Sequence, residues 1–505
     1  MRLAPKLAIS FVTHAIVALL GLLAIPFYLK LLGPDGYGLV GFHVVLQSWM
    51  FILDLGVTAA LSRKLSLYQA GAVPTADVLG LARTAECLFC LTGLMGAMGV
   101  IVASEWVASH WLGDSGLAKG EVVRSLQIMA LMIALRWVSA LYQAALVGLE
   151  RQNAANLLSV MGAVLRPATA FLAFALIEPS PSLFFSTQAA VVFAELVAFR
   201  LLLARSLPAW GSAPASLRMI KGELSFAGGL AMTSLIWLVI YQSDKLVLSH
   251  LLPLAEFGEF SIVSAICSGI TMLVPPFAQA IQPRLTALQA QHRRPEFLAV
   301  YRICMSLMVV LAAAFAGTIG SQPALVIYAW TGDALLAARM ASVLSFYAIG
   351  TGLAAVLVVP YLLQYALGNI RLHLIGNLAF GAVWIPVVLW AAFQHGSRGT
   401  GLAWLIGNLT FLACWVPVVH RRLLSRPERK GLDVSTFWRL TLLTAFLAIP
   451  AVVEIAPVGR VAALAALCCI FLGTLAAGVI ISSDLRKVVT LWISRQLLSA
   501  KEVGR

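Results

Sequence analysis

Six ionisable side chains lie deep within apolar stretches of the chain: Asp54, Arg136, Arg166, Glu195, Asp244 and Lys245. A charge at the centre of a bilayer costs about 2.5–3.5 kcal/mol on the insertion scale, so six charges facing lipid would cost on the order of 15–20 kcal/mol. That cost exceeds the net stability of most domains. We therefore expect these side chains to line an internal polar space.

Helical spacing gathers further polar side chains onto the same faces. His43, Gln47 and Asp54 are four and seven residues apart, which places them on one face of a helix. The same spacing joins Arg136 to Ser139 and Gln143, joins Gln188 to Glu195, and forms a long stripe of Ser261, Ser264, Ser268, Thr271, Pro275, Gln279 and Gln282. Hydrophilic faces of this kind are what a translocation cavity requires.

Arg136 and Arg166 are the strongest candidates for contact with a substrate. A guanidinium group binds a phosphate or carboxylate through two parallel hydrogen bonds. Gln143 and Gln279, which lie on the polar faces, add neutral donors and acceptors. We predict that these four residues contribute to a substrate-binding site.

The acidic residues allow two interpretations. Asp54 and Glu195 could carry a coupling proton or cation, or could pair with the two arginines as latches between helices, and the sequence favours pairing. His43 shares the face of Asp54 and belongs to the same group. Asp244 and Lys245 are adjacent and project to different sides of a helix, so we do not expect them to neutralise each other, although either could join an interhelical pair.

One ion pair is predicted outside this set. Glu86 follows Arg83 by three residues at the inner end of an apolar stretch, which is the spacing of neighbouring side chains on a helix. We predict that the two form a pair at the membrane interface.

Composition defines the surroundings of all these residues. Of 505 residues, 61% are hydrophobic and only 11% are charged, against about 25% charged in soluble domains. The mean hydropathy is +0.94, and apolar runs of about 20 residues, the length of a transmembrane helix, recur throughout. The sequence therefore predicts an all-α polytopic membrane protein. The net charge of +14 then reflects cytoplasmic loops, and no nucleic-acid partner is expected.

Fourteen spans are predicted, at about 8–31, 38–61, 83–105, 124–148, 156–177, 183–205, 224–251, 257–281, 299–320, 340–367, 373–393, 400–420, 438–456 and 459–481. If the N-terminus is inside, the inner segments hold 26 Lys and Arg and the outer segments only six. This asymmetry predicts two cytoplasmic termini. The first span is long enough to be retained, so no cleaved signal is expected.

The spans form two groups. We predict an N-terminal six-helix bundle, a Pro/Ser/Gly-containing cytoplasmic linker, a C-terminal six-helix bundle, two extra transmembrane helices and an amphipathic cytoplasmic tail, with limits of 1–205, 206–223, 224–420, 421–481 and 482–505. Tyr37-Gly38 recurs as Phe257-Gly258 at an offset of 220 residues, a weak repeat of the kind found in two-half transporters. No phosphate-binding loop or hydrolase motif is present, so we expect no enzyme.

Several short motifs, taken together, resemble a known family. They are Leu31-Leu-Gly-Pro-Asp-Gly-Tyr-Gly38, Leu53-Asp-Leu-Gly56, Ser62-Arg-Lys64, Gln242-Ser-Asp-Lys245, Leu251-Leu-Pro-Leu254, Phe257-Gly258, Pro275-Pro276 and Pro283-Arg284. This set resembles the Wzx-type polysaccharide and O-antigen flippases of the multidrug/oligosaccharidyl-lipid/polysaccharide (MOP) exporter superfamily. The resemblance covers spans one to twelve.

The resemblance implies two pseudo-symmetric bundles that open alternately to each side of the bacterial inner membrane. It implies an undecaprenyl-pyrophosphate-linked oligosaccharide as substrate, with Lys245 joining Arg136 and Arg166 as basic cavity residues. A gradient of H+ or Na+ could drive the cycle, and no other cofactor is expected. Membrane lipids, a polysaccharide polymerase and a chain-length regulator are the expected partners.

Three alternatives stay open. A cation-coupled multidrug antiporter of the same superfamily usually carries membrane carboxylates in its first, seventh, eighth or tenth span, and here only Asp244 fits. A lipid II flippase is chemically closer, but its dense basic cavity is not evident. A membrane scaffold that transports nothing is disfavoured, because it gives no reason for buried charges.

The charge asymmetry makes a direct prediction about topology. A reporter fused after Lys430 should be active only as a cytoplasmic reporter, and one fused after Gly116 only as a periplasmic reporter. Paired alkaline phosphatase and fluorescent-protein fusions measure this. A C-terminus that proves periplasmic would contradict the predicted orientation.

Overall fold

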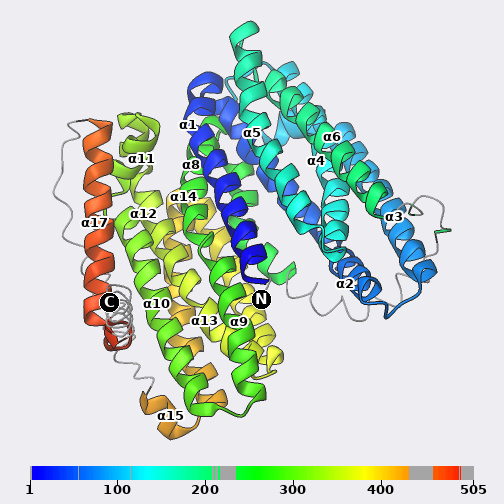
Figure 1. Ribbon diagram of the computed structural model, residues 1–505. Coiled ribbons are helices and arrows are strands. Elements are labelled where there is room, and N and C mark those ends of the chain that lie inside the picture. The colour runs from blue at the N-terminus through cyan, green and yellow to red at the C-terminus, as the bar shows by residue number, and fades with distance from the viewer. Residues whose placement is uncertain are drawn as a thin grey trace, which may run out of the picture. The chain divides into compact units, whose positions relative to one another are not determined.

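The computed structural model describes residues 3–54, 56–113, 115–207, 235–431 and 459–487, with the isolated positions 210, 214, 215 and 490. Every regular element among them is a helix, which confirms the predicted all-α class (Figure 1). Ten described helices are long and apolar enough to cross a membrane.

These ten helices overlap twelve of the predicted spans, because two of them each overlap two spans. The described helix at 235–251 lies in the seventh span. The thirteenth span, 438–456, lies outside the described residues, so the count of fourteen stays a prediction. Most of the linker 206–223 and of the tail 482–505 also lies outside them.

The chain divides into two compact units, Met1–Ser261 and Ile262–Arg505. The first holds α1 (Leu3–Met50), η1 (Phe51–Asp54), α2 (Val57–Gln69), α3 (Thr75–Trp106), η2 (Val107–Trp111), α4 (Lys119–Gly148), α5 (Gln152–Leu176) and α6 (Pro181–Ser206). The second holds most of α8 (Leu254–Thr271), then α9 (Val274–Ala290), α10 (Arg294–Ser321), α11 (Pro323–Thr331), α12 (Ala334–Val356), α13 (Val358–Ala366), α14 (Ile370–Leu423), α15 (Arg426–Gly431) and α17 (Arg460–Ile481).

Glycine and proline break several spans that the sequence predicts as continuous. Gly56 has a φ of +80°, a left-handed conformation that favours glycine, and it separates η1 from α2 inside the predicted span 38–61. Gly396, with a φ of +55°, bends α14. Pro275-Pro276 lie at the start of α9, where prolines are tolerated because the first helical N–H groups lack partners. The predicted span 257–281 is therefore two helices.

The two copies of the predicted short repeat, Tyr37-Gly38 and Phe257-Gly258, lie in contact within the first unit. A Cβ atom on Gly258 would collide with the carbonyl oxygen of Pro34 and lie 2.9 Å from the backbone nitrogen of Gly38. A Cβ atom on Gly38 would in turn collide with the carbonyl oxygen of Leu254. Only glycine allows two helix backbones to approach this closely. The repeated glycines thus mark a helix contact.

A buried carboxylate joins three helices of the first unit. Glu86 on α3 lies 2.7 Å from Arg83 and 3.2 Å from Arg200 on α6, which confirms the predicted pair with Arg83. Glu86 also accepts hydrogen bonds from the Tyr142 hydroxyl on α4 at 2.6 Å and from the Trp210 indole at 2.9 Å. Trp210 is fully buried, so this network also holds the start of the segment after α6.

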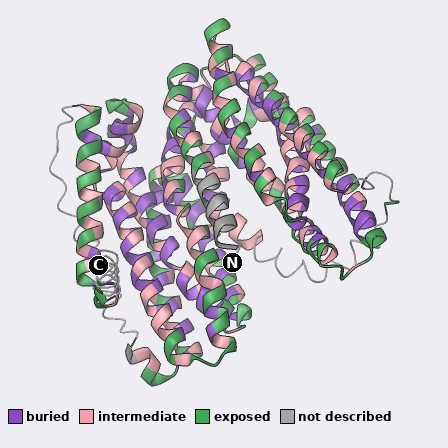
Figure 2. Cartoon of the chain, viewed as in Figure 1, coloured by how far each residue is buried: buried purple, intermediate pink, exposed green. Residues whose placement is uncertain are grey.

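The second unit is built around α12, which packs against both α10 and α14. Figure 2 shows buried residues concentrated on these helices and mostly exposed residues on α17. α17 packs against α10 and α11, where Phe471 lies 4.7 Å from Phe315 between ring centroids. The short α11 was not predicted; Arg460 of α17 donates hydrogen bonds to its Ala329 and Trp330 carbonyls.

An ion pair fastens α15 to the start of α10. The Arg294 Nε donates to Glu428 Oε1 at 2.6 Å, and an Nη donates to Oε2 at 3.2 Å. The Ser425 backbone N–H also donates to Glu428. These bonds stabilise the ionised carboxylate and lower the pKa of Glu428 from its ordinary 4.5 to about 2. The hydrogen bond from Arg294 has the largest effect.

This pair predicts a pH dependence for the attachment of α15. Because the pKa of Glu428 is lowered in the folded state, its stabilisation is present above about pH 4.5 and is lost as the pH falls towards about 2. We expect Glu428→Gln to loosen α15 at neutral pH by about 1 kcal/mol and to remove this pH dependence. Hydrogen–deuterium exchange of Arg426–Gly431, corrected for intrinsic rates, measures both effects.

The matched control is Glu296→Gln, which removes a more exposed i,i+3 partner of Arg293 near the same helix end. This change should leave α15 protected. Equal exchange in the Glu428→Gln protein and the wild type would show that the ion pair does not hold α15.

Candidate functional site

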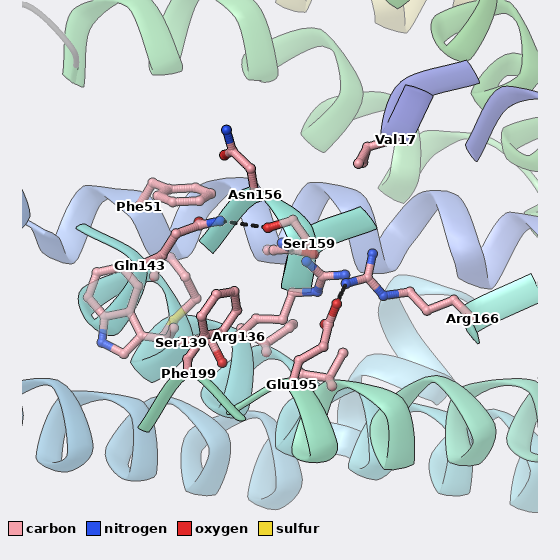
Figure 3. A pocket seen from close by; sticks show the side chains of 16 residues that line it. Val17, Phe51, Arg136, Ser139, Gln143, Asn156, Ser159, Arg166, Glu195 and Phe199 are labelled. Carbon is pink, nitrogen blue, oxygen red and sulfur yellow. Dashed lines mark hydrogen bonds and ion pairs between the residues drawn. The ribbon is translucent and has the colours of Figure 1, made fainter. Parts of the chain in front are cut away.

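A polar cavity of about 320 Å³ lies inside the first unit, among α1, η1, α4, α5 and α6 (Figure 3). Its volume is at the lower end of the range for small-molecule sites. It is lined by Val17, Gln47, Met50, Phe51, Ile133, Arg136, Trp137, Ser139, Ala140, Gln143, Asn156, Ser159, Arg166, Val192, Glu195 and Phe199. The sequence-predicted Arg136, Arg166, Gln143 and Glu195 thus meet in one place.

Arg166 and Glu195 form an ion pair between α5 and α6. One terminal nitrogen of Arg166 lies 2.7 Å and 2.5 Å from the two carboxylate oxygens of Glu195. Gln188, two turns before Glu195, donates a hydrogen bond to the Arg166 carbonyl at 3.1 Å and ties the same helices together. Of the two roles proposed for Glu195, the observed contact is the one expected of helix pairing.

Gly162 provides the space that the Glu195 carboxylate occupies. It lies one turn before Arg166 on α5, and a Cβ atom there would collide with the carboxylate of Glu195. Sequence reasoning missed Gly162, because a glycine within an apolar helix carries no chemical group. Its spacing of four residues from Arg166 was the available signal.

Arg136 differs from Arg166 in having no counter-ion in contact. Among the residues that the structure describes, none forms a hydrogen bond or an ion pair with its guanidinium group. Figure 3 shows Arg136 beside Arg166 and Glu195, with its side chain in the cavity. Since Glu195 already binds Arg166, the cavity presents one uncompensated positive charge to a ligand.

Neutral polar groups and aromatic rings complete the cavity. Gln143 donates a hydrogen bond to the Ser159 hydroxyl at 2.9 Å, and the buried Asn156 Nδ2 has no hydrogen-bond partner among the described residues. Phe51 and Trp137 form part of the wall. Asn156 and Ser159 were missed, although they are ten and seven residues before Arg166, on or near its helical face.

The other predicted site residues lie elsewhere. Asp54 does not line the cavity and contacts neither arginine; its two carboxylate oxygens accept hydrogen bonds from the Thr58 backbone N–H at 3.0 Å and the Thr58 hydroxyl at 2.7 Å. His43 is buried against Phe185. Gln279 is exposed on α9 of the second unit.

The expectation that Asp244 and Lys245 cannot neutralise each other is wrong. The Lys245 Nζ lies 3.6 Å from Asp244 Oδ1 and donates a hydrogen bond to the Tyr241 carbonyl at 2.6 Å. The long, flexible lysine side chain bends back along the helix and overcomes the angle between adjacent positions. Neither residue lines the cavity.

Known structures share this fold. A multidrug resistance MATE family transporter of the MOP superfamily, in an inward-facing conformation, has a TM-score of 0.68 and 15% identity, over 83% of this chain and 99% of that one. The lipid II flippase MurJ, in an inward closed conformation, has a TM-score of 0.72 and 12% identity, over 94% and 98%. The chain therefore shares the fold of these two membrane proteins.

The sequence comparisons define the family within that fold. The model of the family described as "Polysaccharide biosynthesis protein" matches residues 3–289. A relative from Shigella flexneri, named "Putative O-antigen transporter", is 18% identical over 399 residues, which is 77% of this chain and 91% of the relative. The chain belongs to the polysaccharide biosynthesis protein family, and the predicted resemblance is confirmed at this level.

The contacts of Asp54 predict how its variants behave. Asp54→Asn keeps an acceptor for the Thr58 N–H, whereas Asp54→Ala leaves this N–H in the first turn of α2 without its side-chain acceptor. We expect the alanine variant to lose roughly 0.5–2 kcal/mol of stability and the asparagine variant to remain folded and active in transport. Thermal unfolding of the purified protein and a transport assay measure the two effects. A folded but inactive Asp54→Asn protein would instead support the proton-carrier interpretation.

Proposed function

We propose that this protein is a flippase that moves undecaprenyl-pyrophosphate-linked oligosaccharide units across the inner membrane by alternating access, for assembly of a surface polysaccharide. One observation carries the proposal: a cavity inside a transporter fold presents the uncompensated guanidinium of Arg136 to an anionic ligand. The family and the O-antigen relative support a polysaccharide intermediate as that ligand. The protein acts as a transporter and not as an enzyme.

In this proposal Arg136 binds an anionic group of the substrate, and the neutral donors around it contact sugar hydroxyls. Arg166 contributes positive potential while it stays paired with Glu195. Both termini are cytoplasmic, and a gradient of H+ or Na+ supplies the energy. A polymerase and a chain-length regulator receive the glycan in the periplasm.

The lipid II flippase function is a second candidate, favoured by one observation: the fold of that flippase matches 94% of this chain. Lipid II and lipid-linked O-antigen units share a polyprenyl pyrophosphate and differ in their glycan. The two functions separate in cells, because depletion of a lipid II flippase arrests growth, whereas loss of an O-antigen flippase removes surface glycan.

Loss of the free guanidinium should stop transport without unfolding the protein. We expect Arg136→Ala to abolish surface glycan at normal membrane abundance, because no described residue forms a hydrogen bond or ion pair with Arg136 that its removal would break. Arg136→Lys should retain part of the activity, since lysine keeps the charge but loses the two-pronged geometry. Immunoblots of glycan and protein measure both quantities.

Two controls separate binding from folding. Arg398→Ala removes an exposed arginine outside the cavity and should change nothing. Arg166→Ala leaves Glu195 unpaired and should reduce protein abundance as well as glycan. Normal glycan in the Arg136→Ala strain would rule out the proposed role of this residue.

A further inference from the structure

The ionised groups of the cavity are two guanidinium groups and one carboxylate. Glu195 is held 2.5–2.7 Å from Arg166, whereas Arg136 has no hydrogen-bond or ion-pair partner among the described residues. The cavity can therefore neutralise one negative charge on a ligand without rearrangement. A second negative charge would find no cation of its own in the cavity, because Glu195 already neutralises Arg166.

We propose that Glu195 determines the anion specificity of this cavity: by occupying Arg166, it makes the site selective for a singly charged oxyanion, such as one phosphodiester group or one sugar carboxylate. The inference rests on the proposed function and specifies what Arg136 binds. In a pyrophosphate-linked substrate, this cavity then engages one anionic group, and the second charge has no cation of its own there.

Local packing keeps Glu195 in this role. The carboxylate of Glu195 occupies the space beside Gly162, where a side chain would collide with it. The hydrogen bond from Gln188 to the Arg166 carbonyl fixes α5 and α6 in register. Arg166 is not saturated, because its buried Nε has no hydrogen-bond partner among the described residues. If Glu195 lost its charge, Arg166 would have donors available for a second anionic group.

The test measures binding of two matched probes to the full-length protein in nanodiscs by titration calorimetry. Dimethyl phosphate carries one negative charge, and symmetrical dimethyl pyrophosphate carries two. We expect the wild type to bind dimethyl phosphate more tightly than dimethyl pyrophosphate. In Glu195→Gln the ratio of pyrophosphate affinity to phosphate affinity should rise by about tenfold, the scale of one added charge-assisted hydrogen bond. The control Glu86→Gln, which removes another arginine-paired carboxylate outside the cavity, should leave the ratio unchanged.

A double variant tests the occupation of Arg166 directly. Arg136→Ala should bind neither probe, and Arg136→Ala with Glu195→Gln should regain phosphate binding, because the released Arg166 replaces Arg136. A structural role for Glu195 alone gives no such rescue. If Glu195→Gln fails to accumulate, Gly162→Ala serves as a second test of the role of Glu195. Its added methyl group would displace the Glu195 carboxylate and should also raise the ratio of pyrophosphate affinity to phosphate affinity.

The outcomes distinguish this inference from the proposed function. Binding that depends on Arg136 but shows no change of ratio and no rescue in the Glu195 variants overturns the role of Glu195 and leaves the anion site intact. Failure of the wild type to bind either probe overturns the anion site itself, and with it the basis for both proposals.

Discussion

An ionised side chain inside a bilayer needs either a partner or a polar cavity, because hydrocarbon offers no solvation in place of water. Glu86 and Glu195 meet this requirement with arginine partners, and the pairs Glu86–Arg200 and Arg166–Glu195 join different helices of the first unit. Arg136 meets it differently, by facing a cavity of about 320 Å³. The arrangement of α3, α4, α5 and α6 thus depends on where these charges can be accommodated. Arg136, which has no hydrogen-bond or ion-pair partner among the residues that the structure describes, marks the site.

Glycine makes the charge pairs and helix contacts geometrically possible. In lipid, helices gain little from hydrophobic association, so they rely on close packing and polar contacts. Gly162 admits the Glu195 carboxylate between α5 and α6, and Gly38 and Gly258 let two backbones approach within contact distance. A side chain at any of these positions would separate helices that the ion pairs and hydrogen bonds must join.

The shared fold does not by itself define a substrate. Multidrug transporters and a lipid II flippase have the same fold at 12–15% identity, so function must be argued from the site. The cavity described here combines one free guanidinium, neutral donors and aromatic walls. These groups suit an anionic, hydroxyl-rich ligand better than a cationic drug, in agreement with the polysaccharide family to which the chain belongs.

The sequence alone determined the helical membrane class, the polar helix faces that carry Arg136 and Arg166, and the pair of Arg83 with Glu86. Each of these follows from composition or from spacing along one helix, which are local quantities. The tertiary structure decided that Arg166 pairs with Glu195, that Asp54 instead accepts hydrogen bonds from Thr58 of α2, and that Gly162 belongs to the site. Spacing shows which residues share a face, but not which neighbouring helix that face meets. The partner of a buried charge, and the charge left without one, are therefore set only when the helices pack.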